Sequence, residues 1–206
     1  MVIEFIKPVR YGILLGLLGI IFGILWSFWL VLGHEKIHED LEKRAVKKQS
    51  SFIQLFAPQE AYAHSKKETP VVMEHKQGME EEPKPHVMGG HDDPVIDLAH
   101  RILARGHIHS IGLGFLTIVI SMVLAFTSAG DTTKSVASII TGLGGILNPI
   151  AWIIMGYRIP AMGLEEADAS VRVIAGPAAV LVLSGISVAA FFIVKDIISS
   201  AFSEKK

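Results

Sequence analysis

Four long, uncharged apolar runs constrain this chain more than any other feature. They extend from about Tyr11 to Gly33, Ile108 to Ser128, Val136 to Tyr157 and Val173 to Val194. Each is close to the roughly 20 residues that a helix needs to cross a bilayer. A chain of 206 residues that is 50% apolar has too little polar sequence to enclose four such helices in a soluble shell. We therefore predict an all-α integral membrane protein with four transmembrane helices.

A long extramembrane loop, expected to be helical at both ends, separates the first apolar run from the second. We predict three regions: residues 1–33 (N-terminus and first transmembrane helix), residues 34–108 (an outer-face loop rich in His and Met), and residues 109–206 (the other three helices and a short C-terminal tail). From His34 to about Gln49 the loop holds good helix formers with Glu-to-Lys spacings of three and four. The first transmembrane helix should therefore continue into water.

The other end of the loop carries a helix-start signal. Asp92 and Asp93 precede Pro94, which places a capping acid before a proline at the first helical position. An apolar stripe follows, which predicts an amphipathic helix on the membrane surface or against the first extension. Gly106 is the expected bend into the second transmembrane helix.

The charges flanking the runs predict an orientation. The short segments on the side of the termini are basic, with Lys7, Arg10, Lys134, Lys195, Lys205 and Lys206. By the positive-inside rule both termini are cytoplasmic, and the long loop is periplasmic in a bacterial-type inner membrane. Lys36, Lys43, Arg44, Lys47 and Lys48 open the long loop, and long loops cross largely regardless of charge.

Composition excludes several classes of protein. The chain has no cysteine, which removes disulfides, thiolate zinc sites, cysteine-ligated iron–sulfur clusters and covalently attached haem. The net charge of −1 and the absence of a basic stripe indicate no nucleic-acid partner. The expected partners are the lipid bilayer and either other membrane subunits or further copies of this chain.

All nine histidines lie between His34 and His109, and imidazole is the commonest protein ligand for transition metals. His34 and His38 are four residues apart, so they share one face of a helix. His107 and His109 begin the second apolar run, and His100 lies two helical turns before His107. If the first two transmembrane helices are antiparallel neighbours, these side chains approach each other. We predict an outer-face site for copper or zinc, with ligands drawn from His34, His38, His100, His107 and His109.

Other residues extend this site. A carboxylate could complete the shell, with Glu35, Glu39, Glu42, Glu165, Glu166 and Asp168 as candidates. The middle of the loop adds weaker candidate ligands, Met73, His75, Met79, His86, Met88 and His91. Their spacing suits soft ions, Cu(I) above all.

Three alternatives stay open. The first is a b-type cytochrome subunit for electron transfer, with haem between His34 or His38 and His107 or His109, and with glycine-rich helices making room for the macrocycle. The second is a structural membrane subunit without a cofactor. The third is a zinc peptidase, because His34-Glu35-x-x-His38 matches the peptidase pattern. Lys36 occupies an inner position of that pattern and no third-ligand motif follows, so we expect no enzyme activity from this chain alone.

The apolar runs also carry packing signals. Gly12, Gly16, Gly19 and Gly23 form small-xxx-small pairs, which allow transmembrane helices to approach closely. Pro149 and Pro177 predict kinks in the third and fourth helices. The runs hold no acid or lysine, and this disfavours an ion pathway through the chain by itself.

Overall fold

The computed structural model describes residues 2–56 and 93–203, and every regular element in that part of the chain is helical. A short helix α1 (Val2–Ile6) and a 3₁₀ turn η1 (Lys7–Val9) lead into the long helices. These are α2 (Arg10–Leu32), α3 (His34–Phe56), α4 (Pro94–Ala125), α5 (Asp131–Met162) and α6 (Leu164–Ser203).

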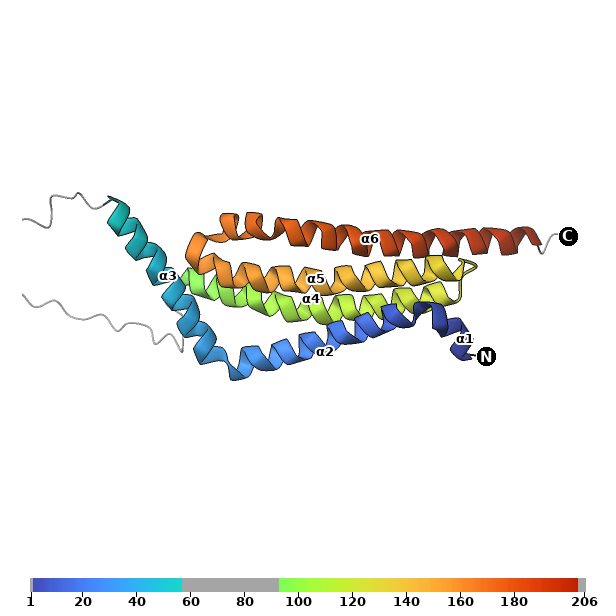
Figure 1. Cartoon of the computed structure of the whole chain (residues 1–206), viewed down its shortest axis with the longest axis horizontal. Coiled ribbons are helices and arrows are strands. Elements are labelled where there is room, and N and C mark those ends of the chain that lie inside the picture. The colour runs from blue at the N-terminus through green and yellow to red at the C-terminus, as the bar shows by residue number, and fades with distance from the viewer. Residues whose placement is uncertain (1, 57–92, 204–206) are drawn as a thin grey trace, which may run out of the picture.

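Four helices form the body of the molecule. Helices α2, α4, α5 and α6 lie lengthwise beside one another, and both termini lie at one end, which we call the terminal end (Figure 1). Helix α3 lies at the opposite end, the α3 end, and crosses the bundle obliquely (Figure 1). The described residues include four helices long and apolar enough to cross a membrane, which confirms the predicted number. Three of them extend beyond the apolar runs, to 32, 32 and 40 residues.

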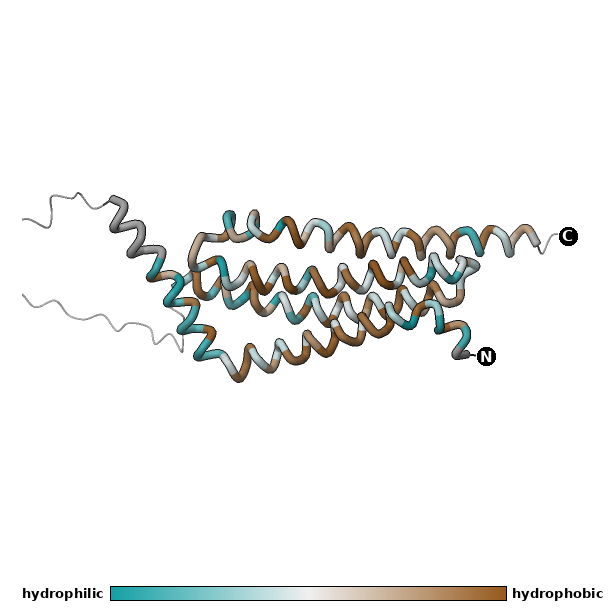
Figure 2. Tube along the Cα trace, viewed as in Figure 1, coloured by the Kyte–Doolittle hydropathy of each residue, from teal (hydrophilic) through white to brown (hydrophobic). Residues whose placement is uncertain are grey.

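Helix α2 turns large apolar side chains outward and small residues inward. The buried positions of α2 are all glycines, whereas Leu25, Phe28 and Leu32 are 62%, 61% and 83% exposed. The apolar character of α2 is visible along most of its length (Figure 2). A soluble protein buries such side chains, and patches of this size on its surface are rare. The distribution fits a multi-pass membrane protein, whose outer surface faces lipid.

Glycines bring α2 into direct contact with α4. A Cβ added at Gly16 would lie 2.7 Å from the carbonyl oxygen of Gly114, and one added at Gly114 would lie 2.6 Å from the carbonyl oxygen of Gly16. The hydroxyl of Ser110 donates a hydrogen bond of 2.6 Å to the carbonyl oxygen of Gly19 across the same contact. The glycines therefore pack the helices, as predicted.

Helix α4 begins as the sequence predicts. The carboxylate of Asp93 accepts a hydrogen bond of 2.8 Å from the backbone N–H of Val95, and Pro94 is the first helical residue. Gly106 does not interrupt α4, which continues through it as one helix. A Cβ at Gly106 would lie 2.7 Å from Ile153, so this glycine allows α4 to approach α5 closely.

The terminal end is held by polar contacts between helix ends. The buried Nζ of Lys134, in the first turn of α5, donates a hydrogen bond of 2.9 Å to the carbonyl oxygen of Ala125 at the end of α4. The carboxylate of Asp196 on α6 accepts a bond of 2.8 Å from the backbone N–H of Ser128 and a second bond from its hydroxyl. The α4–α5 connection is thereby attached to α6.

Candidate functional site

The site at the α3 end depends on a break between α2 and α3 at Gly33. Helix α2 ends at Leu32, and the N–H of the capping residue Gly33 donates a hydrogen bond of 2.8 Å to the carbonyl oxygen of Trp29. Helix α3 starts at the next residue, His34. A Cβ at Gly33 would lie 2.8 Å from that oxygen and 3.4 Å from the indole ring. The chain does continue as a helix past the first span, as expected, but it changes direction at this glycine and crosses the bundle (Figure 1).

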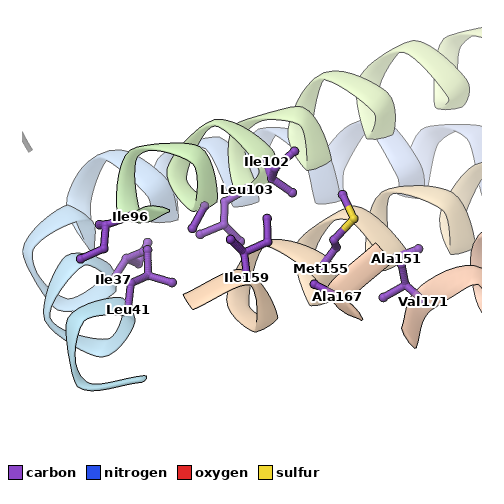
Figure 3. Packing of buried hydrophobic residues seen from close by; sticks show 11 residues of the cluster. Ile37, Leu41, Ile96, Ile102, Leu103, Ala151, Met155, Ile159, Ala167 and Val171 are labelled. Atoms are coloured by element: carbon purple, nitrogen blue, oxygen red, sulfur yellow. The ribbon is translucent and has the colours of Figure 1, made fainter. Parts of the chain in front are cut away.

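Two apolar side chains dock α3 onto the bundle. Ile37 is 3% exposed and Leu41 is fully buried, and they are four residues apart on one face of α3. They belong to the cluster of buried residues in Figure 3, where they lie beside Ile96 of α4. The predicted apolar stripe at the start of α4 is therefore packed against the first extension.

Three imidazoles lie next to this apolar contact. His34 and His38 precede Ile37 and Leu41 by three residues, and His100 follows Ile96 by four. The ring centroid of His100 lies 5.1 Å from that of His34 and 5.6 Å from that of His38, and the two α3 rings are 6.3 Å apart. Nδ1 of His38 lies 3.4 Å from Nε2 of His100. We call His34, His38 and His100 the histidine cluster.

Two glutamates of α3, Glu42 and Glu39, differ in their partners. Glu42 reaches the histidine cluster, with Oε1 at 3.1 Å from Nε2 of His38. Glu39 instead accepts a hydrogen bond of 2.6 Å from Lys43. That bond and the positive charge of Lys43 hold the pKa of Glu39 below its ordinary value. Only one of these two acids is thus engaged with an imidazole.

Aromatic side chains gather at the α3 end of the bundle, near the site. The indole N–H of Trp26 donates a hydrogen bond of 3.1 Å to the carbonyl oxygen of Leu103, and its ring meets Tyr157 edge-on at 6.4 Å. Trp29 and Trp152 lie in the same end of the molecule, so all three tryptophans of the chain are there. We call these three residues the tryptophan belt, because tryptophans gathered at one level are typical of membrane–water interfaces. Sequence analysis missed this belt, although the positions of the tryptophans near the ends of the apolar runs are a signal for it.

The other two predicted ligands of α4 lie deeper in the bundle or on another face. His107 is two turns, about 10 Å, along α4 from His100, and its carbonyl oxygen would lie 3.1 Å from a Cβ at Gly23. Its Nδ1 is buried and has no hydrogen-bond partner in the part of the chain that the structure describes. The ring of His109 lies 5.1 Å from that of Trp152 on α5. The structure thus brings His100 to His34 and His38, and not His107 or His109.

The remaining candidates lie elsewhere. Asp168 pairs with Arg172 at 2.7 Å on α6, and Glu165 and Glu166 are exposed in the first turn of that helix. Glu35 is exposed on α3. The weaker candidates Met73, His75, Met79, His86, Met88 and His91 lie outside the described residues.

The geometry of the histidine cluster can be compared with that of a metal centre. Two nitrogen ligands at about 2.05 Å from a tetrahedral ion are about 3.4 Å apart, the same separation as between Nδ1 of His38 and Nε2 of His100. Within residues 2–56 and 93–203, however, no three His, Cys, Asp or Glu side chains are already gathered as a complete ligand set. The His38–His100 pair, which also has the geometry of a hydrogen bond, has the nitrogen separation of two metal ligands.

The site has no counterpart that would assign it by similarity. Comparison of the chain with protein-family models, with curated proteins and with solved structures finds no match.

Proposed function

We propose that this protein is a multi-pass membrane protein that binds a transition metal at the histidine cluster, as a metal-handling protein or as the accessory subunit of a larger membrane complex. The observation that carries the proposal is the 3.4 Å approach of two imidazole nitrogens from different helices. Neutral imidazole is a good ligand for copper and zinc, and a pair at this separation fits two corners of a tetrahedral ion.

The third ligand in this proposal is His34. Its ring lies 5.1 Å from that of His100 and is exposed, so it can turn toward the ion by rotation about its side-chain bonds. A water molecule would take the fourth position. Three protein ligands and one open position are typical of sites that exchange or react with a bound group.

The site lies on the water side of the tryptophan belt in this proposal. His100 is three residues closer to the start of α4 than Leu103, whose carbonyl oxygen accepts the Trp26 hydrogen bond. The short segments at the opposite, terminal end carry Lys7, Arg10, Lys134 and Lys195. Under the positive-inside rule these residues support cytoplasmic termini and a histidine cluster on the outer face of a bacterial-type inner membrane. An ion arriving from outside would meet the cluster without crossing the bilayer.

The test is equilibrium metal binding by the purified protein in nanodiscs. We expect Zn²⁺ and Cu²⁺ to bind with one-to-one stoichiometry, and His38→Ala or His100→Ala to weaken binding at least tenfold. The matched control is His109→Ala, which removes an imidazole from the same helix but outside the cluster. Equal affinity in all variants would overturn the proposal. Reduced-haem bands in the visible spectrum of the purified protein would replace it with the b-type cytochrome alternative.

A further inference from the structure

His38 has a different neighbour at each of its ring nitrogens. Nε2 lies 3.1 Å from the carboxylate of Glu42, one turn further along α3. Nδ1 lies 3.4 Å from Nε2 of His100 on α4. The ring is therefore held between an acid on its own helix and an imidazole on another helix.

The two neighbours differ in what they can offer. A carboxylate only accepts hydrogen bonds, so the contact with Glu42 is favourable when Nε2 of His38 carries a proton. A neutral imidazole carries one N–H, and its other nitrogen then has a lone pair. For His38 that other nitrogen is Nδ1, the atom that faces His100.

We propose that Glu42 is a positioning residue that selects the Nε2–H tautomer of His38, so that His38 binds a metal through Nδ1 and His100 binds it through Nε2. This inference rests on the proposed metal site, but the tautomer exists in the metal-free protein too. Carboxylates that hold the second N–H of a ligand histidine are common around metal sites, and their loss typically weakens metal binding by about 10- to 100-fold.

The chain offers a matched control for Glu42. Glu39 lies on the same helix and carries the same charge, but its partner is Lys43 and not an imidazole. Glu39→Ala and Glu42→Ala therefore remove the same negative charge from α3. Only the second variant removes a hydrogen-bond acceptor from His38.

The experiment measures the tautomer first, by ¹⁵N NMR of histidine-labelled, metal-free protein at about pH 8, where imidazole is ordinarily neutral. The His38 signals are assigned by their loss in His38→Gln. We expect a protonated Nε2 in the wild type and in Glu39→Ala, and a mixture of tautomers in Glu42→Ala. An unchanged tautomer in Glu42→Ala, or an equal change in Glu39→Ala, would overturn the assignment.

Zn²⁺ affinity is then measured on the same variants. Glu42→Ala should bind at least tenfold more weakly than the wild type, and Glu42→Gln should recover part of the loss, because its amide oxygen can still accept from Nε2. Wild-type affinity in Glu42→Ala would overturn the positioning role. Absence of Zn²⁺ binding in the wild type would defeat the proposed function, whereas the tautomer measurement would still decide what Glu42 does to His38.

Discussion

The α2–α4 contact and the α3–α4 contact lie on the same helix and are built in different ways. In the first, backbones touch, with the Gly16 and Gly114 carbonyl oxygens within 3 Å of where a side chain would begin. In the second, Ile37 and Leu41 supply the packing, and imidazoles lie beside them. At Gly16 and Gly114 the facing backbones leave no room for even a Cβ between the two helices. The three imidazoles of the histidine cluster lie at the second contact, where side chains separate the helices.

The largest expected effect is at the backbone contact. Gly114→Leu would force α2 and α4 apart, because the new Cβ would lie 2.6 Å from a backbone oxygen that cannot rotate away. We expect a loss of stability above about 3 kcal/mol, the upper end of typical overpacking costs, and failure to recover a folded bundle. Thermal unfolding in detergent measures it. Gly112→Leu is the control, since a Cβ at Gly112 meets nothing within 4 Å; equal damage from both would refute the close-contact account.

The next effect separates the two contacts. Leu41→Ala removes a fully buried side chain from the docking face of α3. We expect the free energy of unfolding to fall by about 2 kcal/mol. This is the low end for a buried leucine, because α3 can move closer to the bundle and fill part of the cavity. Hydrogen exchange should accelerate in α3 while α2, α4, α5 and α6 keep their protection, and metal affinity should fall with it. Faster exchange throughout the bundle would show that the two contacts are not independent.

The sequence predicts the bundle well for a simple reason. Apolar runs of membrane length are dictated by the bilayer, and Gly16 and Gly19 could be assigned to packing because small residues are what lipid-embedded helices use to approach each other. The first residue of α4 was equally predictable, since Asp93 and Pro94 start the helix through local geometry. Each of these features depends on near neighbours in the chain or on the solvent.

The candidate site was only partly predictable. The shared face of His34 and His38 follows from helical spacing, but the choice of His100 as their neighbour depends on the direction of α3 after Gly33. That direction is decided by where Ile37 and Leu41 find an apolar surface, which is a tertiary contact between segments distant in sequence. Helical periodicity contains no information about it. A straight continuation of α2 would not bring α3 across the end of α4.

A smaller effect is expected from the hydrogen bond between Ser110 and Gly19 across the backbone contact. Ser110→Ala removes the donor to the carbonyl oxygen of Gly19. Interhelical hydrogen bonds in membrane proteins contribute about 0.6 kcal/mol on average, so we expect a shift in the unfolding midpoint close to that value. Ser184→Ala serves as the control, because that hydroxyl donates to Val180 within its own helix. A loss of several kcal/mol would mean that the hydroxyl, not the glycines, holds the contact.

The smallest effect concerns the exposed face of α3. Lys43→Met should return the pKa of the Glu39 carboxyl upward to its ordinary value, because the hydrogen bond and charge that lower it are removed. A lowered carboxyl pKa adds stability above the unfolded-state pKa, and this is lost as pH falls through the folded-state pKa. Both side chains are more than half exposed, so we expect no measurable change in unfolding at any pH. ¹³C NMR titration checks the pKa; a clear pH-dependent loss of stability would contradict the view that this pair is solvated.

The most direct test of the metal site is X-ray absorption at the zinc edge of the Zn²⁺-loaded protein, recorded for the wild type and for His100→Ala. We predict a first shell with two or three imidazole nitrogens at about 2.0–2.1 Å in the wild type, and one imidazole fewer in the variant. A shell of oxygen ligands only, or an imidazole count that does not change when His100 is removed, would contradict a metal centre shared between α3 and α4.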